Sequence, residues 1–139
     1  MEPDAISGGC LCGAIRYVVR GRPSMSMICH CASCRRAGGA PAVAWVTFAQ
    51  ADMTFVRGTP ASFQSSAPAT RTFCASCGTP LTYLHAARPT EIDVTTATLD
   101  APHAFPPTHH AWVAEGIPWA RPTDGLPADP HDSGAGRAP

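Results

Sequence analysis

The chain has 139 residues, the size of one domain, and its ten basic and ten acidic side chains give a formal net charge of zero. All ten basic residues are Arg, and the lack of Lys excludes a Schiff-base lysine, a Lys general base and the lysine of a P-loop. The lack of net positive charge argues against a polyanion-binding surface, so no nucleic-acid partner is expected.

Short runs rich in β-branched residues, bounded by turn residues, predict a mostly antiparallel β structure. After a short lead-in over residues 1–9, the expected strands are 15–19, 42–48, 53–56, 61–64, 71–73, 79–84 and 91–98. Residues 34–38 are expected to form one helical turn. Because no window holds an apolar stripe of helical period over three turns, we expect a mainly β fold with little helix.

The composition changes near the C-terminus. From Gly116 onward Pro and Gly dominate, and residues 131–139 have the composition of a disordered segment. Two apolar stretches in this region, 117–119 and 126–127, are expected to pack as a strap against the body. The expected organisation is one domain over residues 1–128, followed by a flexible Pro/Gly-rich tail over residues 129–139.

The N-terminal segment and the longest apolar stretch are used to predict the cellular compartment. The N-terminus lacks the basic and apolar regions of a secretory signal, and residues 40–51 fall far short of a ~20-residue membrane span. We therefore expect a soluble cytoplasmic protein with no membrane partner; its oligomeric state is not indicated. In the cytoplasm, disulfides are uncommon and cysteine clusters more often bind metal or act in catalysis.

The low content of large apolar residues predicts a hydrophobic core that stabilises the fold only weakly by itself. Ile, Leu, Val and Phe number 22 of 139 residues, about 16% of the chain and below the ~20% at which ordinary globular packing becomes doubtful. The seven cysteines form three groups: Cys10-x-Cys12, Cys29-x-Cys31-x-x-Cys34 and Cys74-x-x-Cys77. This spacing favours zinc over buried free thiols, and the flanking sequence lacks the βαβ pattern of a C-x-x-C redox protein.

Counting the ligands divides the cysteines between two sites. A structural zinc takes four N or S ligands, and a catalytic zinc commonly takes three plus an exchangeable fourth. The two outer pairs supply four thiolates and would close one site, which leaves three for the other. Spacing alone also allows an outer pair to combine with the middle cluster, or His85, His109 or His110 to close the second site. His30 lies between two ligands and would point away from the metal if that segment is extended.

The segments around these cysteines are Gly8-Gly9-Cys10-Leu11-Cys12-Gly13, Cys29-His30-Cys31-Ala32-Ser33-Cys34-Arg35-Arg36 and Phe73-Cys74-Ala75-Ser76-Cys77-Gly78. They resemble the glutathione-dependent formaldehyde-activating enzyme family, which includes the centromere protein V relatives. The later segments His110-Ala111-Trp112-Val113, Ile117-Pro118-Trp119 and Asp124-Gly125-Leu126-Pro127 are similar to the same family. The resemblance covers about residues 7–127.

The resemblance implies a small zinc-stabilised β fold of the Mss4-like, or β-tent, group with two zinc ions per chain. In this family pattern, the structural zinc would be held by Cys10, Cys12, Cys74 and Cys77. The zinc associated with activity would be held by Cys29, Cys31 and Cys34. The implied activity is that of a carbon–sulfur lyase handling a glutathione-like thiol and an aldehyde such as formaldehyde. The chain has no Lys to match a family Lys near the glutathione site, so we expect Arg35 or Arg36 to bind the glutathione carboxylates.

A zinc ion held by three thiolates would carry a net charge of about −1 and would be a poorer Lewis acid than one held by imidazoles. We expect such a site to bind a soft thiolate rather than to generate hydroxide. The bound thiol would add to an aldehyde to give a hemithioacetal, and the reverse step is carbon–sulfur cleavage. Two other functions fit the cysteine pattern: a non-catalytic, zinc-stabilised binding module, and a metal-storage or redox-sensing protein.

Overall fold

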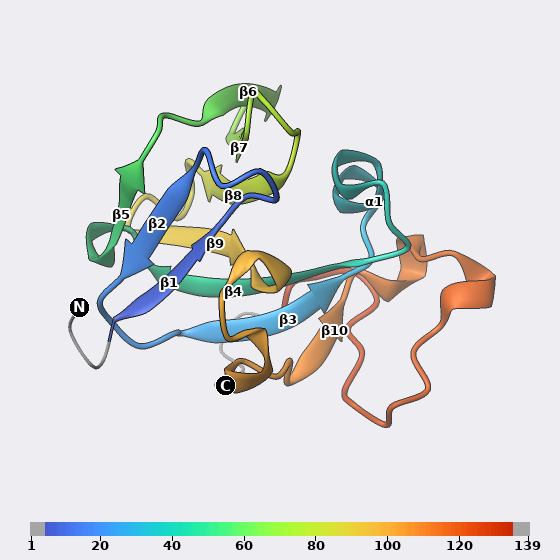
Figure 1. The fold of residues 1–139 in the computed structure, drawn as a ribbon. Coiled ribbons are helices and arrows are strands. Elements are labelled where there is room, and N and C mark those ends of the chain that lie inside the picture. Colours follow the sequence, from blue (N-terminus) through green and yellow to red (C-terminus); the bar gives the residue numbers. More distant parts are fainter. Residues whose placement is uncertain (1–4, 135–139) are drawn as a thin grey trace.

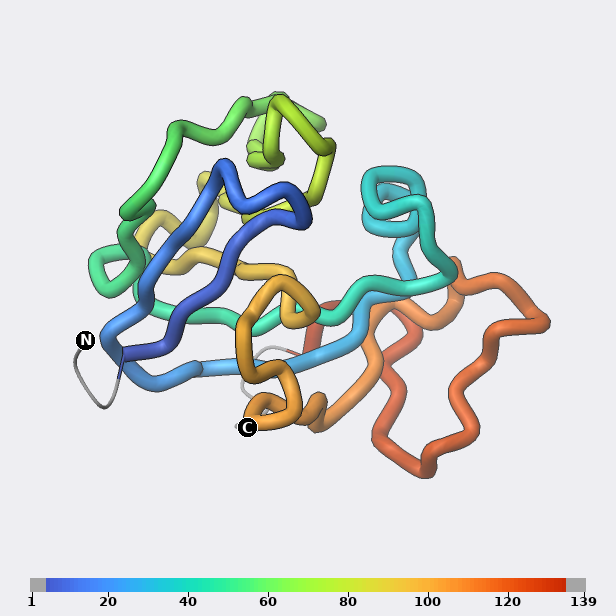
Figure 2. The backbone as a smooth tube through the Cα atoms, in the orientation of Figure 1, coloured from blue at the N-terminus to red at the C-terminus, as the bar shows by residue number. Residues whose placement is uncertain are grey.

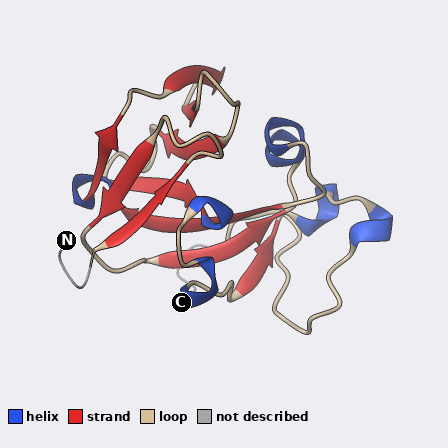
Figure 3. Cartoon of the chain, viewed as in Figure 1, coloured by secondary structure: helices blue, strands red, loops and turns tan. Residues whose placement is uncertain are grey.

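The computed structural model describes residues 5–134, and within them the chain is mainly β, with ten strands and one α-helix. The strands are β1 (Ile6–Gly9), β2 (Arg16–Val19), β3 (Met25–Cys29), β4 (Val43–Ala49), β5 (Met53–Arg57), β6 (Ala61–Ser66), β7 (Ala69–Phe73), β8 (Pro80–His85), β9 (Glu91–Thr95) and β10 (His109–Ala111). The helix is α1 (Ala32–Gly38), and single 3-10 turns cover Gln50–Asp52, Thr96–Thr98, Pro102–Ala104, Val113–Glu115 and Pro118–Ala120. Figure 3 shows how far strands predominate, which confirms the expected fold class.

The strands form two sheets. The smaller sheet has the order β1-β2-β5, and the larger has the order β10-β3-β4-β9-β8-β7-β6. Neighbouring strands pair antiparallel except β10, which runs parallel to β3. The small sheet crosses one face of the large one, and α1 lies beyond the ends of β3 and β4 (Figure 1).

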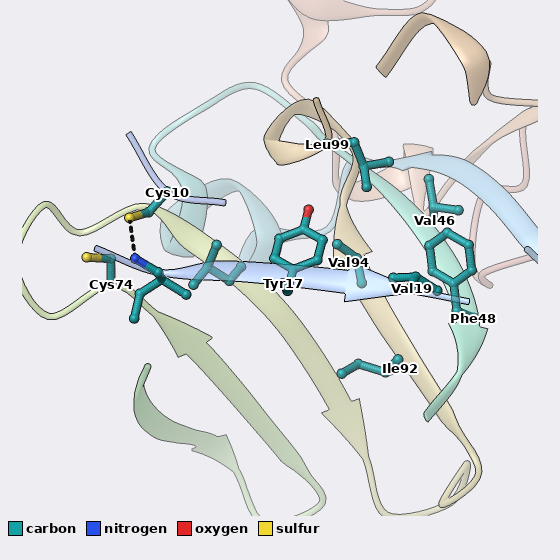
Figure 4. Close-up of a cluster of buried hydrophobic side chains, with 11 residues drawn as sticks. Cys10, Tyr17, Val19, Val46, Phe48, Cys74, Ile92, Val94 and Leu99 are labelled. Carbon is teal, nitrogen blue, oxygen red and sulfur yellow. Dashed lines mark hydrogen bonds between the residues drawn. The ribbon is translucent and has the colours of Figure 1, made fainter. Parts of the chain in front are cut away.

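The core fills the space between the two sheets. Alternate residues of β2, Tyr17 and Val19, are fully buried, as period-two patterning requires of a strand with one face covered. They belong to one cluster with Phe48 of β4 and with other buried residues of β9. In Figure 4, Cys10 and Cys74 lie together at one end of this cluster and Phe48 lies at the other. The four-cysteine group is therefore built directly onto the end of the core.

The strands predicted from the sequence are present with small shifts at their ends, but three observed strands were not predicted. Residues 6–9 were expected to be a lead-in and instead form β1, which pairs with β2. β3 lies between β4 and β10 and is buried at four of its five residues, so it lacks polar alternation. β10 has only three residues, His109–Ala111, too few to show a period. The strand predicted over 91–98 ends at Thr95, and residues Thr96–Thr98 form a 3-10 turn instead.

The segment after β10 leaves the sheet and returns to it. In Figure 2, residues 112–128 form a long irregular loop beside α1, drawn in orange to red. Residues 127–132 then bond back to the body; for example, the Asp129 N–H donates to the His110 carbonyl (2.9 Å) and the Trp112 N–H donates to the Asp132 carbonyl (3.1 Å). The flexible tail predicted over 129–139 thus begins with residues that are hydrogen-bonded to the body. Its last residues, 135–139, and the first residues of the predicted domain, 1–4, lie outside the described residues.

Among residues 5–134, no helix has both the length and the apolar character needed to cross a membrane.

Candidate metal centres and the adjoining cavity

The first candidate metal centre brings together the two outer cysteine pairs. Cys10 and Cys12 come from the loop after β1, and Cys74 and Cys77 come from the turn between β7 and β8. Their four sulfur atoms all lie within 4.8 Å of one another. The Cys12 sulfur is 3.6 Å from that of Cys10 and 3.7 Å from that of Cys74. Four thiolates around a tetrahedral zinc, with Zn–S bonds of about 2.3 Å, would be spaced by about 3.8 Å, so the residues fit such an ion.

Two similar turns position these sulfurs. The Gly13 N–H donates to the Cys10 carbonyl (3.2 Å), and the Gly78 N–H donates to the Cys74 carbonyl (2.8 Å). Both glycines have φ = 81°, a backbone conformation that residues with a Cβ atom rarely adopt. Backbone amides also point at sulfur, because the Ile15 N–H donates to Cys10 Sγ at 3.2 Å, the bond dashed in Figure 4. Such donors stabilise thiolates and hence metal ligation.

Thr79 connects the two turns and was not predicted from the sequence. Its hydroxyl oxygen accepts a hydrogen bond from the Leu11 N–H (3.1 Å) and lies 3.2 Å from Cys77 Sγ. The hydrogen bonds of Thr79 to the sulfur lower the pKa of Cys77 to about 5. At neutral pH, Cys77 is therefore ready to act as a thiolate ligand.

The second candidate centre lies where β3 meets α1. Cys29 is the last residue of β3, Cys31 caps the N-terminus of α1 and Cys34 lies in its first turn. Their sulfurs lie within 4.8 Å of one another, and the Cys34 N–H donates to Cys31 Sγ (3.3 Å). Hydrogen bonds from the Cys29 and Cys34 thiols lower the pKa of Cys31, with a further contribution from the positive charge of Arg71. This cluster therefore favours a thiolate, the form that binds metal.

The histidines considered as a fourth ligand have other partners. Among residues 5–134, no histidine nitrogen or carboxylate oxygen joins the three sulfurs within 4.8 Å. His109 Nε2 bonds to the Ser133 carbonyl (2.8 Å), and His85 Nδ1 accepts from the Ala87 N–H (3.1 Å). His110 lies between His30 and Asp124, as described below. The described part of the chain thus leaves the three cysteines without a fourth ligand.

His30 turns away from the cysteines on either side of it and joins a buried chain of polar groups. Its Nε2 lies 2.9 Å from His110 Nδ1, and His110 Nε2 lies 2.8 Å from Asp124 Oδ2. Both imidazoles are buried, and burial lowers the pKa of His30. The hydrogen bond from His110 lowers the pKa of the Asp124 carboxyl. These hydrogen bonds connect His30, just before α1, through His110 to Asp124 in the irregular segment 112–128.

A cavity of about 460 Å³ opens beside the three-cysteine cluster. All three cysteines line it, and charged or aromatic side chains from β4, β7, β8, β9 and the segments after β8 and β10 form much of the remaining wall. These side chains are Trp45, Arg71, Tyr83, His85, Arg88, Asp93, Trp112 and Glu115. A concave site with convergent polar groups is the usual form of a small-molecule site, so this wall is a candidate substrate site.

Arg71 is the arginine nearest to the cysteine sulfurs in this wall. Its Nη2 donates to Cys34 Sγ (3.8 Å), its Nε donates to Ser65 Oγ (3.3 Å), and its guanidinium carbon lies 4.8 Å from the centre of the Tyr83 ring. Among the described residues it has no carboxylate partner. Arg88 differs, because it is paired with Glu91 (2.6 Å) and Asp93 (2.7 Å). Arg71 is therefore a cation available to an anionic ligand.

The two arginines that the sequence favoured lie elsewhere on α1. Arg36 is exposed and Arg35 is half-buried, and neither lines the cavity beside the cysteines. The Arg35 Nε is buried and has no hydrogen-bond partner within residues 5–134. Both side chains lie in the last turn of the helix, where a positive charge is favourable to the helix dipole. Their predicted role in binding glutathione stays a prediction.

The fold and the two cysteine clusters define a β-rich protein with two candidate metal centres. The model of the family described as glutathione-dependent formaldehyde-activating enzyme matches residues 5–115, and the chain belongs to this family. Among solved structures, the crystal structure of a Rhodobacter sphaeroides protein is similar, with a TM-score of 0.58 and 28% sequence identity. That match covers 68% of this chain and 87% of the other. No curated protein matches the sequence significantly.

Proposed function

We propose that the protein is a zinc-dependent enzyme of the carbon–sulfur lyase type, which joins a glutathione-like thiol to a small aldehyde such as formaldehyde and also catalyses the reverse cleavage. One observation carries the proposal: three cysteines line a cavity together with Arg71, and among residues 5–134 the cysteines lack a fourth protein ligand and Arg71 lacks a carboxylate partner. Family membership supports the same reaction. We place the reaction in the cytoplasm, where thiols are kept reduced.

The donor set determines what the second centre would do. A zinc ion held by Cys29, Cys31 and Cys34 would leave one position for an outside sulfur and would stabilise that sulfur as a thiolate. Cys10, Cys12, Cys74 and Cys77 would hold a second zinc ion in a closed site with a structural role. The protein would then contain two zinc ions per chain.

The cavity wall supplies groups that suit a glutathione-like ligand. Glutathione carries two carboxylates, and a guanidinium binds a carboxylate through two parallel hydrogen bonds. Arg71 is suited to this role because it lies beside Cys34 and has no carboxylate partner in the described structure. Arg88 lines the same cavity and would position a second anionic group while it stays paired with Asp93.

His85 lines the same cavity and is suited to stabilise the reacting carbonyl oxygen. Its Nδ1 accepts a hydrogen bond from the Ala87 N–H, so the ring proton of the neutral imidazole is on Nε2. In the addition, the S–H bond of the thiol breaks, a bond forms between sulfur and the aldehyde carbon, and the carbonyl oxygen takes up a proton to become a hydroxyl. We assign to the His85 Nε2–H a hydrogen bond that stabilises this oxygen, while solvent accepts the proton of the thiol and supplies the proton of the hydroxyl.

The experiment that tests the proposal begins with the metal content of freshly purified protein, measured with and without glutathione. We expect two zinc ions per chain. In protein loaded with Co²⁺, we expect the absorption of the second centre to change on addition of glutathione, because a new sulfur ligand alters the cobalt spectrum. Exchange NMR should then show faster formation of S-hydroxymethylglutathione than in buffer, and Cys34→Ser should abolish both effects.

Two other results would point to the other candidate functions. Two tightly held zinc ions, with no response to glutathione and no acceleration of S-hydroxymethylglutathione formation, would contradict the proposal and favour a non-catalytic binding module. Freshly purified protein without metal, whose thiols oxidise in air, would favour a redox role.

A further inference from the structure

A second cavity adjoins the three-cysteine centre, on the side facing β6 and β7. Its volume is about 470 Å³. Three residues, Cys34, Trp45 and Arg71, line both this cavity and the one described above. The two cavities therefore share a wall at the cysteine cluster, where a reacting carbon atom would lie under the proposed function.

The two cavities differ in chemistry. The first contains Arg71, Arg88, Asp93 and Glu115, which suit a charged thiol such as glutathione. In the second, Arg71 at the shared wall is the only charged residue among those that line it. Most of the remaining wall is apolar or small, and the rest of it carries the neutral hydroxyl residues Ser62, Thr72 and Thr82. The apolar or small residues are Ala37, Gly38, Val43, Phe63, Phe73, Gly78 and Pro80. An apolar cavity of this kind is stabilised by an apolar ligand that displaces water from it.

Phe63 strengthens this interpretation. It lies on β6 at the edge of the large sheet and is 63% exposed, one of the few large apolar side chains that the described structure leaves open to solvent. An exposed aromatic ring on the wall of a cavity gains free energy when a ligand covers it. Formaldehyde has only hydrogen on its carbonyl carbon, so it would leave this ring exposed and the cavity filled with water.

We infer that the second cavity binds the apolar substituent of an aldehyde larger than formaldehyde, an alkyl or aryl aldehyde such as hexanal or phenylacetaldehyde. The inference rests on the proposed function for the reaction and on the cavity for the substrate class. The thiol would occupy the charged cavity, and the alkyl or aryl group would enter the apolar one. Addition of the thiol S–H across the aldehyde C=O then forms one S–C bond and one O–H bond, and no oxidant or reductant is needed.

The first test measures binding without chemistry. Hexanamide has the alkyl chain of hexanal and a carbonyl that does not react with thiols. We expect it to bind to the zinc-loaded protein in the absence of glutathione and to change the tryptophan fluorescence, because Trp45 lines the cavity. Ala37→Leu should weaken this binding about tenfold by filling the cavity. Ala37 is exposed on α1 and Leu is a good helix former, so the variant should fold.

Two control variants separate the cavity from general surface effects. Ala49→Leu makes the same change at an exposed position of β4 that does not line the cavity. Val56→Ala removes exposed apolar surface from β5, also outside the cavity, as a control for Phe63→Ala. We expect both controls to bind hexanamide like the unaltered protein, whereas Phe63→Ala should bind it more weakly.

The second test compares substrates by exchange NMR with glutathione present. We expect Ala37→Leu and Phe63→Ala to slow exchange with hexanal about tenfold while exchange with formaldehyde changes less than about twofold. Absence of hexanamide binding, or equal losses for both aldehydes, would overturn the inference and leave the reaction with formaldehyde standing. Binding that Ala37→Leu weakens, without acceleration for either aldehyde, would overturn the proposed reaction and leave the apolar binding site standing.

Discussion

Cys12 Sγ lies 3.7 Å from Cys74 Sγ, although 62 residues separate the two cysteines in the chain. Cys12 follows β1 of the small sheet, and Cys74 follows β7 of the large sheet. A metal ion bound at this point would therefore cross-link the two sheets at the end of the core that they share (Figure 4). The three-cysteine centre joins only β3 and the adjacent helix α1, so the two centres differ in what they hold together.

The two centres should respond differently to loss of one ligand. We expect Cys74→Ser to unfold the protein, because a structural zinc site contributes on the order of 10 kcal/mol, comparable to the total stability of a domain. Cys34→Ser should lose one zinc ion per chain but stay folded and inactive. Denaturant unfolding and zinc analysis measure both effects, and Ser76→Ala serves as a control within the same turn. Similar unfolding curves for Cys74→Ser and Cys34→Ser would contradict the division of roles.

Arg71 should contribute more to glutathione binding than either arginine of α1. We expect Arg71→Ala to weaken glutathione binding to the zinc-loaded protein about tenfold or more, because a charge-assisted hydrogen bond contributes about 1.5–3 kcal/mol. Arg71→Lys should recover only part of this, since it restores the charge without the paired donors. Calorimetric titration with glutathione measures the affinities.

Matched substitutions decide between the arginines. Arg57→Ala changes an arginine outside the cavity and should leave the affinity unchanged. Arg35→Ala and Arg36→Ala test the role predicted from the sequence. If one of these two weakens binding while Arg71→Ala does not, the carboxylate of glutathione is bound from α1 and the assignment to Arg71 is wrong.

Tyr17 should make the protein sensitive to high pH. Burial raises the pKa of Tyr17 to about 12, partly offset by its hydrogen bond with Thr98 Oγ1 (2.7 Å). Because the folded state favours the neutral phenol, its contribution to stability is full below the unfolded pKa of about 10 and is lost as pH rises through about 12. The loss amounts to about 3 kcal/mol. The free energy of unfolding, measured with denaturant between about pH 10 and 12, should fall less steeply with pH for Tyr17→Phe than for the unaltered protein. Equal slopes for the two proteins would refute the assignment.

The sequence allowed the cysteine grouping and most strands to be predicted, because both depend on spacing within short segments. Counting ligands favoured grouping Cys10 and Cys12 with Cys74 and Cys77, and the structure brings these four sulfur atoms together. Strands without polar alternation escaped prediction: β3 is buried at four of its five residues, and β1 ends in two glycines. These strands form through pairing with distant segments, which no local pattern records.

The arginine beside the cysteines could not be identified from the sequence for a similar reason. Arg35 and Arg36 follow Cys34 directly in the chain, but a helix turns them away from the cavity that the cysteine lines. Arg71 comes 37 residues after Cys34 in the chain. It reaches Cys34 because it lies on β7, a strand that the pairing of the large sheet brings close to the cysteines. Sequence distance is therefore a poor guide to the charged groups around a metal centre built from several strands.

Gly8, two residues before the first cysteine, should be needed for full stability. Gly8 is buried opposite Tyr17 in the β1–β2 pair, and a Cβ at Gly8 would lie 2.3 Å from Tyr17 Oη and 2.6 Å from the Thr98 carbonyl oxygen. We expect Gly8→Ala to destabilise the protein by about 2–3 kcal/mol, because the backbone carbonyl cannot move aside as easily as a flexible side chain. Denaturant unfolding at neutral pH measures this change.

A double-mutant cycle identifies the cause of that loss. Tyr17→Phe removes the hydroxyl that lies nearest to the added methyl group, so Gly8→Ala should cost less in the Tyr17→Phe background than in the unaltered protein. Some loss should persist, since the Thr98 carbonyl remains in place. If the two substitutions prove additive, the close approach of β1 to Tyr17 is not what requires glycine at position 8, and the contact with the Thr98 carbonyl alone accounts for the effect.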